Sequence, residues 1–187
     1  FTRCTEASLE AASAQRRTGS WDRVAAHLER AHGCAHQLGR PDAGNILQQL
    51  QDAALCDLTS DSTTAQSWSG VARALDGALE LPAADRLQAG EASRLRQAHR
   101  TAREGADRES RAAAAFDRRC DYRNARADRC PDLCDRRYGN SLYAYQRCIS
   151  ECYRRYPGCT GAPASDTPPA LISPADLSLC QTEAVDE

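Results

Sequence analysis

Cysteine is the residue type whose number and spacing in this sequence could do chemistry. The 187 residues include ten cysteines, and four of them form two pairs, Cys130 with Cys134 and Cys148 with Cys152, each separated by three residues. Residues four positions apart lie on one face of a helix, so each pair presents two thiols together. Two facing pairs can form disulfides between helices or bind a soft metal ion.

The positions of the turns favour disulfides and predict their pairing. The turn Gly139–Asn140 lies between the two pairs, which centre on the adjacent residue 141, and residues equidistant from the turn of an antiparallel helix hairpin face each other. The same rule pairs Cys120 with Cys159 about the hairpin turn and Cys4 with Cys34 about a turn at Gly19. The remaining two cysteines, Cys56 and Cys180, then pair by elimination. The predicted disulfides are Cys4–Cys34, Cys56–Cys180, Cys120–Cys159, Cys130–Cys152 and Cys134–Cys148.

A metal site is the alternative use of these thiols, as in copper-storage helix bundles with many Cys-x3-Cys pairs. The chain has no methionine, which soft-metal sites often recruit, and zinc sites more often use Cys-x2-Cys in loops. His32 and His36 also lie four residues apart, but the sequence offers them no third ligand. We therefore expect neither a bound metal nor a cofactor.

The other residue types exclude several classes of enzyme. Without lysine, the chain cannot form a lysine Schiff base or a phosphate-binding loop ending in Gly-Lys-Ser/Thr. It also contains neither Gly-x-Ser-x-Gly nor Ser-x-x-Lys, two motifs of serine nucleophiles. A buried pair of carboxylates from distant residues is the enzymatic alternative. We predict no catalytic residue and no enzymatic activity.

The cysteine count and the first residue predict an exported protein. Disulfides persist in oxidising compartments. The sequence begins at Phe1 and contains no methionine, so we expect that a signal peptide has been removed. No apolar run approaches the roughly 20 residues that a bilayer span needs. We expect the periplasm, the cell surface or the extracellular space, with no membrane span.

The elements that must position the cysteines are helices. Apolar residues recur at helical spacing, and no alternating strand pattern occurs. We predict an all-α fold of disulfide-stapled helix pairs, forming a bundle or short superhelix, with a long helix that leads into a cross-linked helix hairpin. The polar stretch Thr59–Ser62 is expected as a loop. Five helices are expected over residues 5–17, 21–38, 42–58, 82–129 and 141–156. Another helix is expected to end at residue 81, and a short one is expected to begin at residue 131.

Charge and proline content divide the chain into three predicted regions. Residues 1–81 form an N-terminal helix-pair region, residues 82–159 the long arginine-rich helix with the disulfide hairpin, and residues 160–187 a Pro/Ser-rich acidic tail. Residues 86–159 contain seventeen arginines and ten acidic residues, whereas residues 1–85 contain seven and eleven. The middle region is therefore basic and its neighbours are acidic.

A helical motif occurs twice. Trp21-x-x-Val24-Ala25-x-x-Leu28-x-x-Ala31 returns 47 residues later as Trp68-x-x-Val71-Ala72-x-x-Leu75-x-x-Ala78, and this spacing predicts a stripe that faces the core. The stretches 19–31 and 68–78 resemble the second helix of a tetratricopeptide repeat, although that family repeats every ~34 residues. The resemblance implies a helix-pair scaffold with a concave protein-binding face.

The paired cysteines carry a second resemblance. The pattern CxxxC…CxxxC over residues 120–159 resembles the alpha-hairpinin and twin-cysteine helix-hairpin families. The resemblance implies two helices bridged by four cysteines. Members of these families differ widely in activity, so the resemblance carries no function.

The most distinctive surface composition lies in the hairpin region. Residues 118–156 hold all six tyrosines and ten of the arginines, a mixture typical of protein interfaces. We expect a protein partner, with an anionic glycan or a lipid headgroup as alternatives, and no nucleic acid, because an exported disulfide protein rarely meets it. The contact residues are predicted to be Arg136, Arg137, Tyr138, Tyr143, Arg147, Tyr153 and Arg154.

These features together predict a function without catalysis. We expect an exported structural or protein-interaction component, in the role of an accessory subunit of a cell-surface or extracellular assembly. One alternative is an inhibitor or immunity protein against an exported enzyme, which needs a protruding loop, and Thr59–Thr64 is the candidate loop. The other alternative is a cysteine-based copper-storage bundle.

Overall fold

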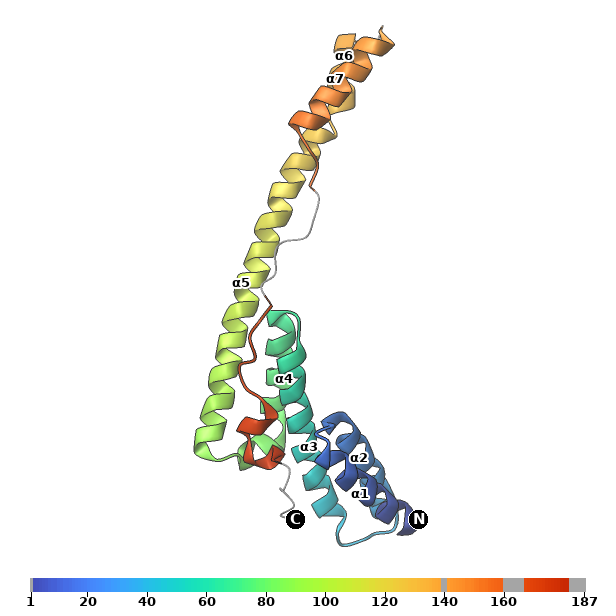
Figure 1. Ribbon diagram of the computed structural model, residues 1–187, viewed down its shortest axis with the longest axis vertical. Helices are drawn as coiled ribbons and strands as arrows, with labels where there is room; N and C mark the ends of the chain where they lie inside the picture. Colours follow the sequence, from blue (N-terminus) through green and yellow to red (C-terminus); the bar gives the residue numbers. More distant parts are fainter. Residues whose placement is uncertain (1, 139–140, 160–166, 182–187) are drawn as a thin grey trace. The chain divides into compact units, whose positions relative to one another are not determined.

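A computed structural model of the chain describes residues 2–138, 141–159 and 167–181 (Figure 1). These residues contain no strand, which confirms the predicted all-α fold class. The elements are α1 (Thr2–Arg17), α2 (Trp21–Gln37), α3 (Ala43–Thr64), α4 (Trp68–Glu80), the 3-10 turn η1 (Pro82–Arg86), α5 (Ala89–Ala127), α6 (Cys130–Tyr138), α7 (Leu142–Arg155), and the 3-10 turns η2 (Pro174–Asp176) and η3 (Ser178–Cys180).

The chain divides into two compact units, which are described separately. The first unit contains residues 1–106 and 166–187, and the second contains residues 107–165. This division differs from the predicted boundaries after residues 81 and 159. The physical reason is that the first half of α5 buries Leu95, Ala98 and Ala102 in the core of the first unit.

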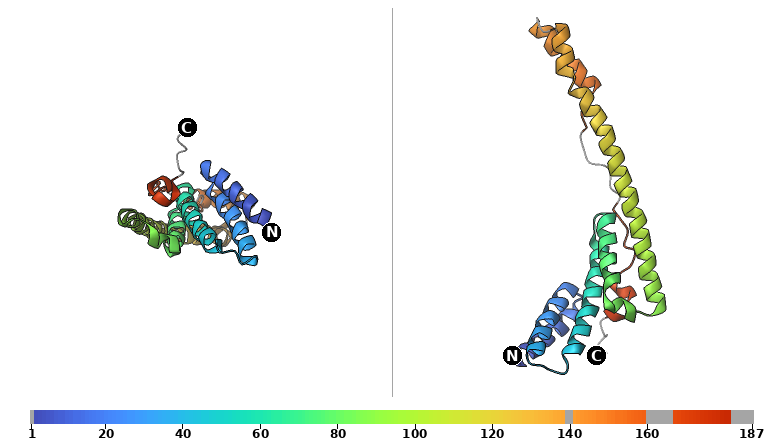
Figure 2. Two further views of the ribbon diagram at one scale, coloured as in Figure 1. Left: turned by 90° about the horizontal axis from the view of Figure 1, so that it is seen from below. Right: turned by 180° about the vertical axis from the view of Figure 1, so that it is seen from behind.

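The first unit is built from consecutive helix pairs. In it α1 packs on α2, α2 on α3 and α3 on α4, as both views of Figure 2 show. The two copies of the repeated motif lie on α2 and α4, where they face the core as predicted. Their buried side chains are Trp21, Val24, Leu28 and Ala31 on α2 and Val71, Ala72, Leu75 and Ala78 on α4. The likeness to tetratricopeptide repeats stays a prediction.

Helix α3 is longer than predicted. The expected end at residue 58 and the expected loop at Thr59–Ser62 are wrong, because α3 continues to Thr64. Thr59 Oγ1 donates to the Leu55 carbonyl over 2.8 Å, and Ser62 Oγ donates to the Thr59 carbonyl over 2.7 Å. These hydroxyls are buried and satisfied on their own helix. Thr59–Thr64 is therefore not the protruding loop that an inhibitor would need.

Helix α5 begins later than predicted. Pro82 starts the short turn η1, which ends where Leu87 takes extended backbone with φ −64° and ψ 145°. The Gln88 N–H then donates to Glu91 Oε2 over 3.0 Å. This hydrogen bond is one of the two that make up a capping box, and a new helix begins at Ala89.

The C-terminal segment is part of the first unit. Ile172, Leu177 and Cys180 are buried in its core, and Cys180 is bonded to Cys56 of α3. Two 3-10 turns, η2 and η3, lie in this segment. The Ser178 N–H donates to Glu91 Oε1 over 2.7 Å, which joins the segment to the start of α5. Residues 160–166 and 182–187 of the predicted tail lie outside the described residues.

The second unit consists of α5 from residue 107 onward, α6 and α7. The predicted turn at residues 139–140 lies outside the described residues. Within the described ranges, none of the helices combines the length and apolar character that a bilayer crossing requires.

Candidate functional site

Five disulfides join all ten cysteines, in the pairs predicted from turn-centred spacing and, for Cys56 and Cys180, by elimination. Cys4 is bonded to Cys34, Cys56 to Cys180, Cys120 to Cys159, Cys130 to Cys152 and Cys134 to Cys148. No cysteine is left as a free thiol. A copper-storage site needs thiolates, so this alternative has no ligands in the disulfide-bonded protein.

Disulfides, and very little apolar packing, hold the second unit together. Its buried side chains are Cys120, Ala127, Cys130 and Cys134, and α7 has no buried residue among those described. The three disulfides close loops of 14, 22 and 39 residues. Cross-links over loops of this length stabilise a fold by about 3–4 kcal/mol each. The disulfides therefore hold the helices of this unit together, while most side chains of these helices are not buried.

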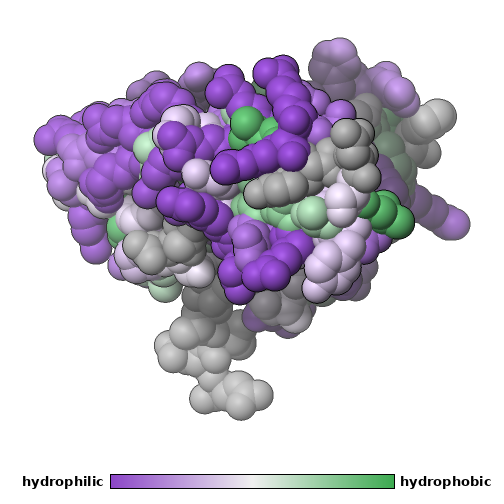
Figure 3. Space-filling view, turned by 90° about the horizontal axis from the view of Figure 1, so that it is seen from above, coloured by the Kyte–Doolittle hydropathy of each residue, from purple (hydrophilic) through white to green (hydrophobic). Residues whose placement is uncertain are grey.

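Apolar side chains are exposed on this uncovered unit. Tyr143 is 77% exposed, Leu142 73% and Leu133 57%. Figure 3 draws one face of the molecule, where small hydrophobic patches lie among hydrophilic side chains. Exposed apolar side chains that gather in one region mark an interaction site more often than scattered ones do.

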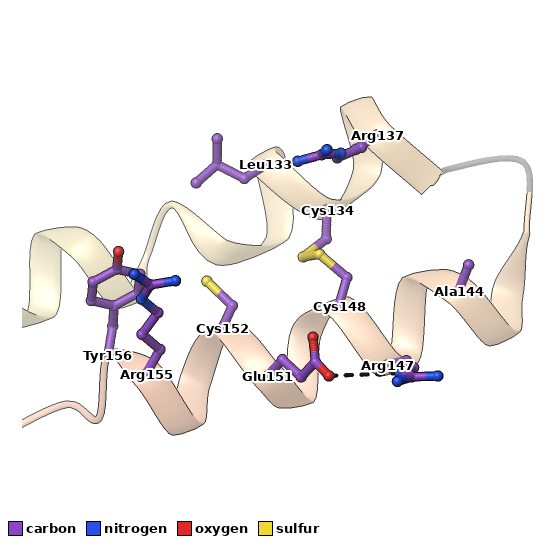
Figure 4. A pocket seen from close by; sticks show the side chains of 10 residues that line it. All are labelled: Leu133, Cys134, Arg137, Ala144, Arg147, Cys148, Glu151, Cys152, Arg155 and Tyr156. Atoms are coloured by element: carbon purple, nitrogen blue, oxygen red, sulfur yellow. Dashed lines mark ion pairs between the residues drawn. A yellow bond between two sulfur atoms is a disulfide. The ribbon is translucent and has the colours of Figure 1, made fainter.

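A cleft of about 770 Å³ lies between α6 and α7 (Figure 4). The Cys134–Cys148 disulfide crosses it and forms part of its floor. We name it the α6–α7 cleft. Its lining residues are Leu133, Cys134, Arg137, Ala144, Arg147, Cys148, Glu151, Cys152, Arg155 and Tyr156.

Only some of the seven predicted contact residues line the cleft. It brings together Arg137 and Arg147, whereas the exposed side chains of Arg136, Tyr143, Tyr153 and Arg154 are not in its lining. Tyr138 is the last residue of α6, and its side chain lies outside the described part of the chain.

The sequence prediction missed five of the lining residues that are not cysteine, namely Leu133, Ala144, Glu151, Arg155 and Tyr156. Leu133 and Ala144 supply apolar surface, and Glu151 and Arg155 supply charge. The signal that could have found them is their helical spacing. Ala144, Glu151 and Arg155 lie three or four residues from Cys148 or Cys152 and so share one side of α7 with the disulfides.

Arginine dominates the electrostatics of the cleft. Three arginines, Arg137, Arg147 and Arg155, line the cleft. Its lining contains one carboxylate, that of Glu151, whose Oε1 lies 3.6 Å from Arg147 Nε. Both members of this pair are more than half exposed, so it contributes only a few tenths of a kcal/mol. The ring centroid of Tyr156, which also lines the cleft, lies 5.4 Å from the Arg126 guanidinium. The cleft therefore attracts negative charge.

A polar cluster of the first unit lies between α4 and α5. His99 Nε2 lies 2.6 Å from Asp76 Oδ1, and Arg103 Nη2 lies 2.9 Å from Asp76 Oδ2. Burial disfavours ionised Asp76, but hydrogen bonds from Arg103 and His99 outweigh burial and lower the pKa of this carboxyl. The cluster joins two helices. Among the described residues, no group of three or more His, Cys, Asp or Glu side chains is placed to bind a metal ion.

Comparisons of the chain with protein-family models, with curated proteins and with solved structures give no match. The resemblances to tetratricopeptide repeats and to alpha-hairpinins therefore stay predictions.

Proposed function

We propose that this protein is an exported, non-enzymatic interaction component that binds a protein partner through the second unit. Its setting is an assembly at the cell surface or in the extracellular space. The observation that carries the proposal is the exposure of Leu142 and Tyr143, 73% and 77%, on a helix that disulfides hold in place. A fixed frame lowers the entropy that binding costs.

The composition around these two residues supports a protein as the partner. Tyr and Arg are the residue types most enriched at binding hot spots. The ten arginines of residues 118–156 are interspersed with five acidic residues, so the surface is mixed in sign as well as partly apolar. A polyanion would gain from the arginines but not from exposed Leu142 or Leu133.

Export is supported by the cross-links. Five disulfides in one chain are typical of proteins that fold in an oxidising compartment and rare in the cytosol. The same disulfides remove cysteine as a nucleophile from the α6–α7 cleft.

Cross-linking and native co-purification from the exporting host test this proposal. The test variant is Leu142→Ser with Tyr143→Ser. The matched control is Leu38→Ser with Leu47→Ser, which changes apolar side chains of the first unit that are 43% and 39% exposed. We expect a protein retained by the wild type and the control and reduced about tenfold or more by the test variant. Equal retention by both variants, or no retained protein, would overturn the proposal.

A further inference from the structure

The α6–α7 cleft is part of an exposed surface formed by these two helices. Helices of a protein pack in layers around a shared core, yet α7 has no buried residue and Leu133 of α6 is 57% exposed. The Cys130–Cys152 and Cys134–Cys148 disulfides join the two helices, so the hairpin stays closed without a third layer. The face is therefore available to a helix from another molecule.

The dimensions of the cleft suit a single helix. Helix α7 has 14 residues and is about 21 Å long. The groove between two adjacent helices accepts the side chains of a third helix laid along it, as in other helix-in-groove complexes. A partner helix of about four turns would cover α7 along its whole length.

The charges specify the partner helix further. Arg147 and Arg155 are eight residues apart on α7 and lie toward opposite ends of the cleft (Figure 4). Their separation along the helix axis is about 12 Å, a distance that carboxylates seven or eight residues apart on a parallel helix also span. Arg137 adds a third guanidinium from α6. Acidic side chains at this spacing would make charge-assisted hydrogen bonds to arginine.

From the open helix face, its length and its charges, we propose that the α6–α7 cleft binds an acidic amphipathic helix of a partner protein. This inference rests on the proposed function and names the partner's binding element. Leu133, Ala144 and the Cys134–Cys148 disulfide contact its apolar stripe, and Arg147 and Arg155 bind acidic side chains on the edge of that stripe. The apolar floor favours a protein helix over an anionic glycan or a lipid headgroup. A second hairpin is disfavoured in the cleft because residues 118–156 are basic.

Peptide display on the full disulfide-bonded chain tests the inference. The probe is a library of 16-residue peptides with helix-favouring composition, selected for binding at low salt and counter-selected on an Arg147→Glu, Arg155→Glu variant. We expect enriched peptides with aliphatic residues at helical spacing and Asp or Glu seven or eight positions apart. The enriched peptides should bind the counter-selection variant about tenfold or more weakly, because a reversed charge leaves acidic side chains facing acidic ones.

The matched control reverses the same charge outside the cleft. Arg136→Glu with Arg154→Glu changes exposed arginines of the same two helices that do not line the cleft, and it should weaken binding much less. Enriched peptides without an acidic helical pattern, equal weakening by both variants, or self-association of the chain that the cleft variant abolishes would each overturn the inference. If the native partner is lost with Leu142→Ser and Tyr143→Ser but kept by the cleft variant, the proposed function stands and this inference fails.

Discussion

Gly105 of α5 lies against the indole ring of Trp68 at the start of α4. A Cβ atom at position 105 would lie 2.2 Å from both Cδ2 and Cε3 of Trp68, well inside van der Waals contact. Only glycine allows this approach of helix and ring. The contact explains a glycine in the interior of a long helix, where it otherwise costs about 0.5–1 kcal/mol relative to alanine.

We predict that Gly105→Ala destabilises the first unit. The added methyl group must displace the indole or the helix, at a cost of about 1–3 kcal/mol. Chemical denaturation followed by Trp fluorescence measures the change in the free energy of unfolding. The control is Gly33→Ala in α2, where a Cβ meets nothing within 4 Å, and it should be neutral or stabilising by up to ~1 kcal/mol. A Gly105→Ala protein as stable as the wild type would contradict the contact.

We predict acid sensitivity from the carboxylate of Glu91. Burial opposes its ionisation, but the N–H groups of Ser178 and Gln88 donate to it and lower the carboxyl pKa below its usual value. A lowered pKa in the folded state stabilises the fold above the usual carboxyl range, and this stabilisation is lost as pH falls through the folded-state pKa. The free energy of unfolding should therefore decrease below about pH 4.3.

The variant Glu91→Gln isolates this effect. It keeps one acceptor oxygen but removes the charge, so stability at pH 7 should fall by about 1–2 kcal/mol. Its unfolding free energy should also depend less on pH between about 5 and 3 than that of the wild type. Denaturation curves over this pH range measure both values. Parallel curves for the two proteins would show that Glu91 does not carry the acid sensitivity.

The sequence predicts the helices and the cysteine pairs because both follow from regular spacing. Val24, Leu28 and Ala31 repeat at helical intervals, and the structure buries all three. Cys134 and Cys148 centre on residue 141, next to a recognisable Gly-Asn turn, and the two helices that carry them are short and close in sequence. In such cases local periodicity determines which side chains meet.

The sequence does not predict contacts that depend on distant segments. Thr59 and Ser62 look like loop residues, but their hydroxyls are satisfied on α3 because that part of the helix is buried. Glu91 and Ser178 are 87 residues apart, and no local pattern indicates their hydrogen bond. The α6–α7 cleft is also a tertiary feature, since Leu133 and Arg155 come from different helices.

We predict that the intact chain contains no free thiol. Its mass under non-reducing conditions should be ten hydrogen atoms lower than after reduction, two for each of the five disulfides. Intact mass spectrometry measures the difference, and peptide mapping identifies the pairs. A reduced mass accompanied by bound copper or zinc would contradict the disulfide framework and restore the metal-storage alternative.

We predict that α7 depends on its disulfides for stability more than α2 does. Removing one disulfide with Cys130→Ala and Cys152→Ala should lower the stability of the second unit by about 3 kcal/mol. Because α7 has no buried residue, we expect its amide hydrogens to exchange much faster in this variant. Amide hydrogen exchange with mass spectrometry measures protection over residues 142–155.

The matched control removes the disulfide of the first helix pair with Cys4→Ala and Cys34→Ala. Helix α2 buries Val24, Leu28 and Ala31 in the core, so its amides should stay protected when this disulfide is lost. Apolar burial stabilises α2 by about 1.5–3 kcal/mol for each large side chain, a source of stability that α7 lacks. Equal deprotection of α2 and α7 in the two variants would show that packing does not distinguish the two units.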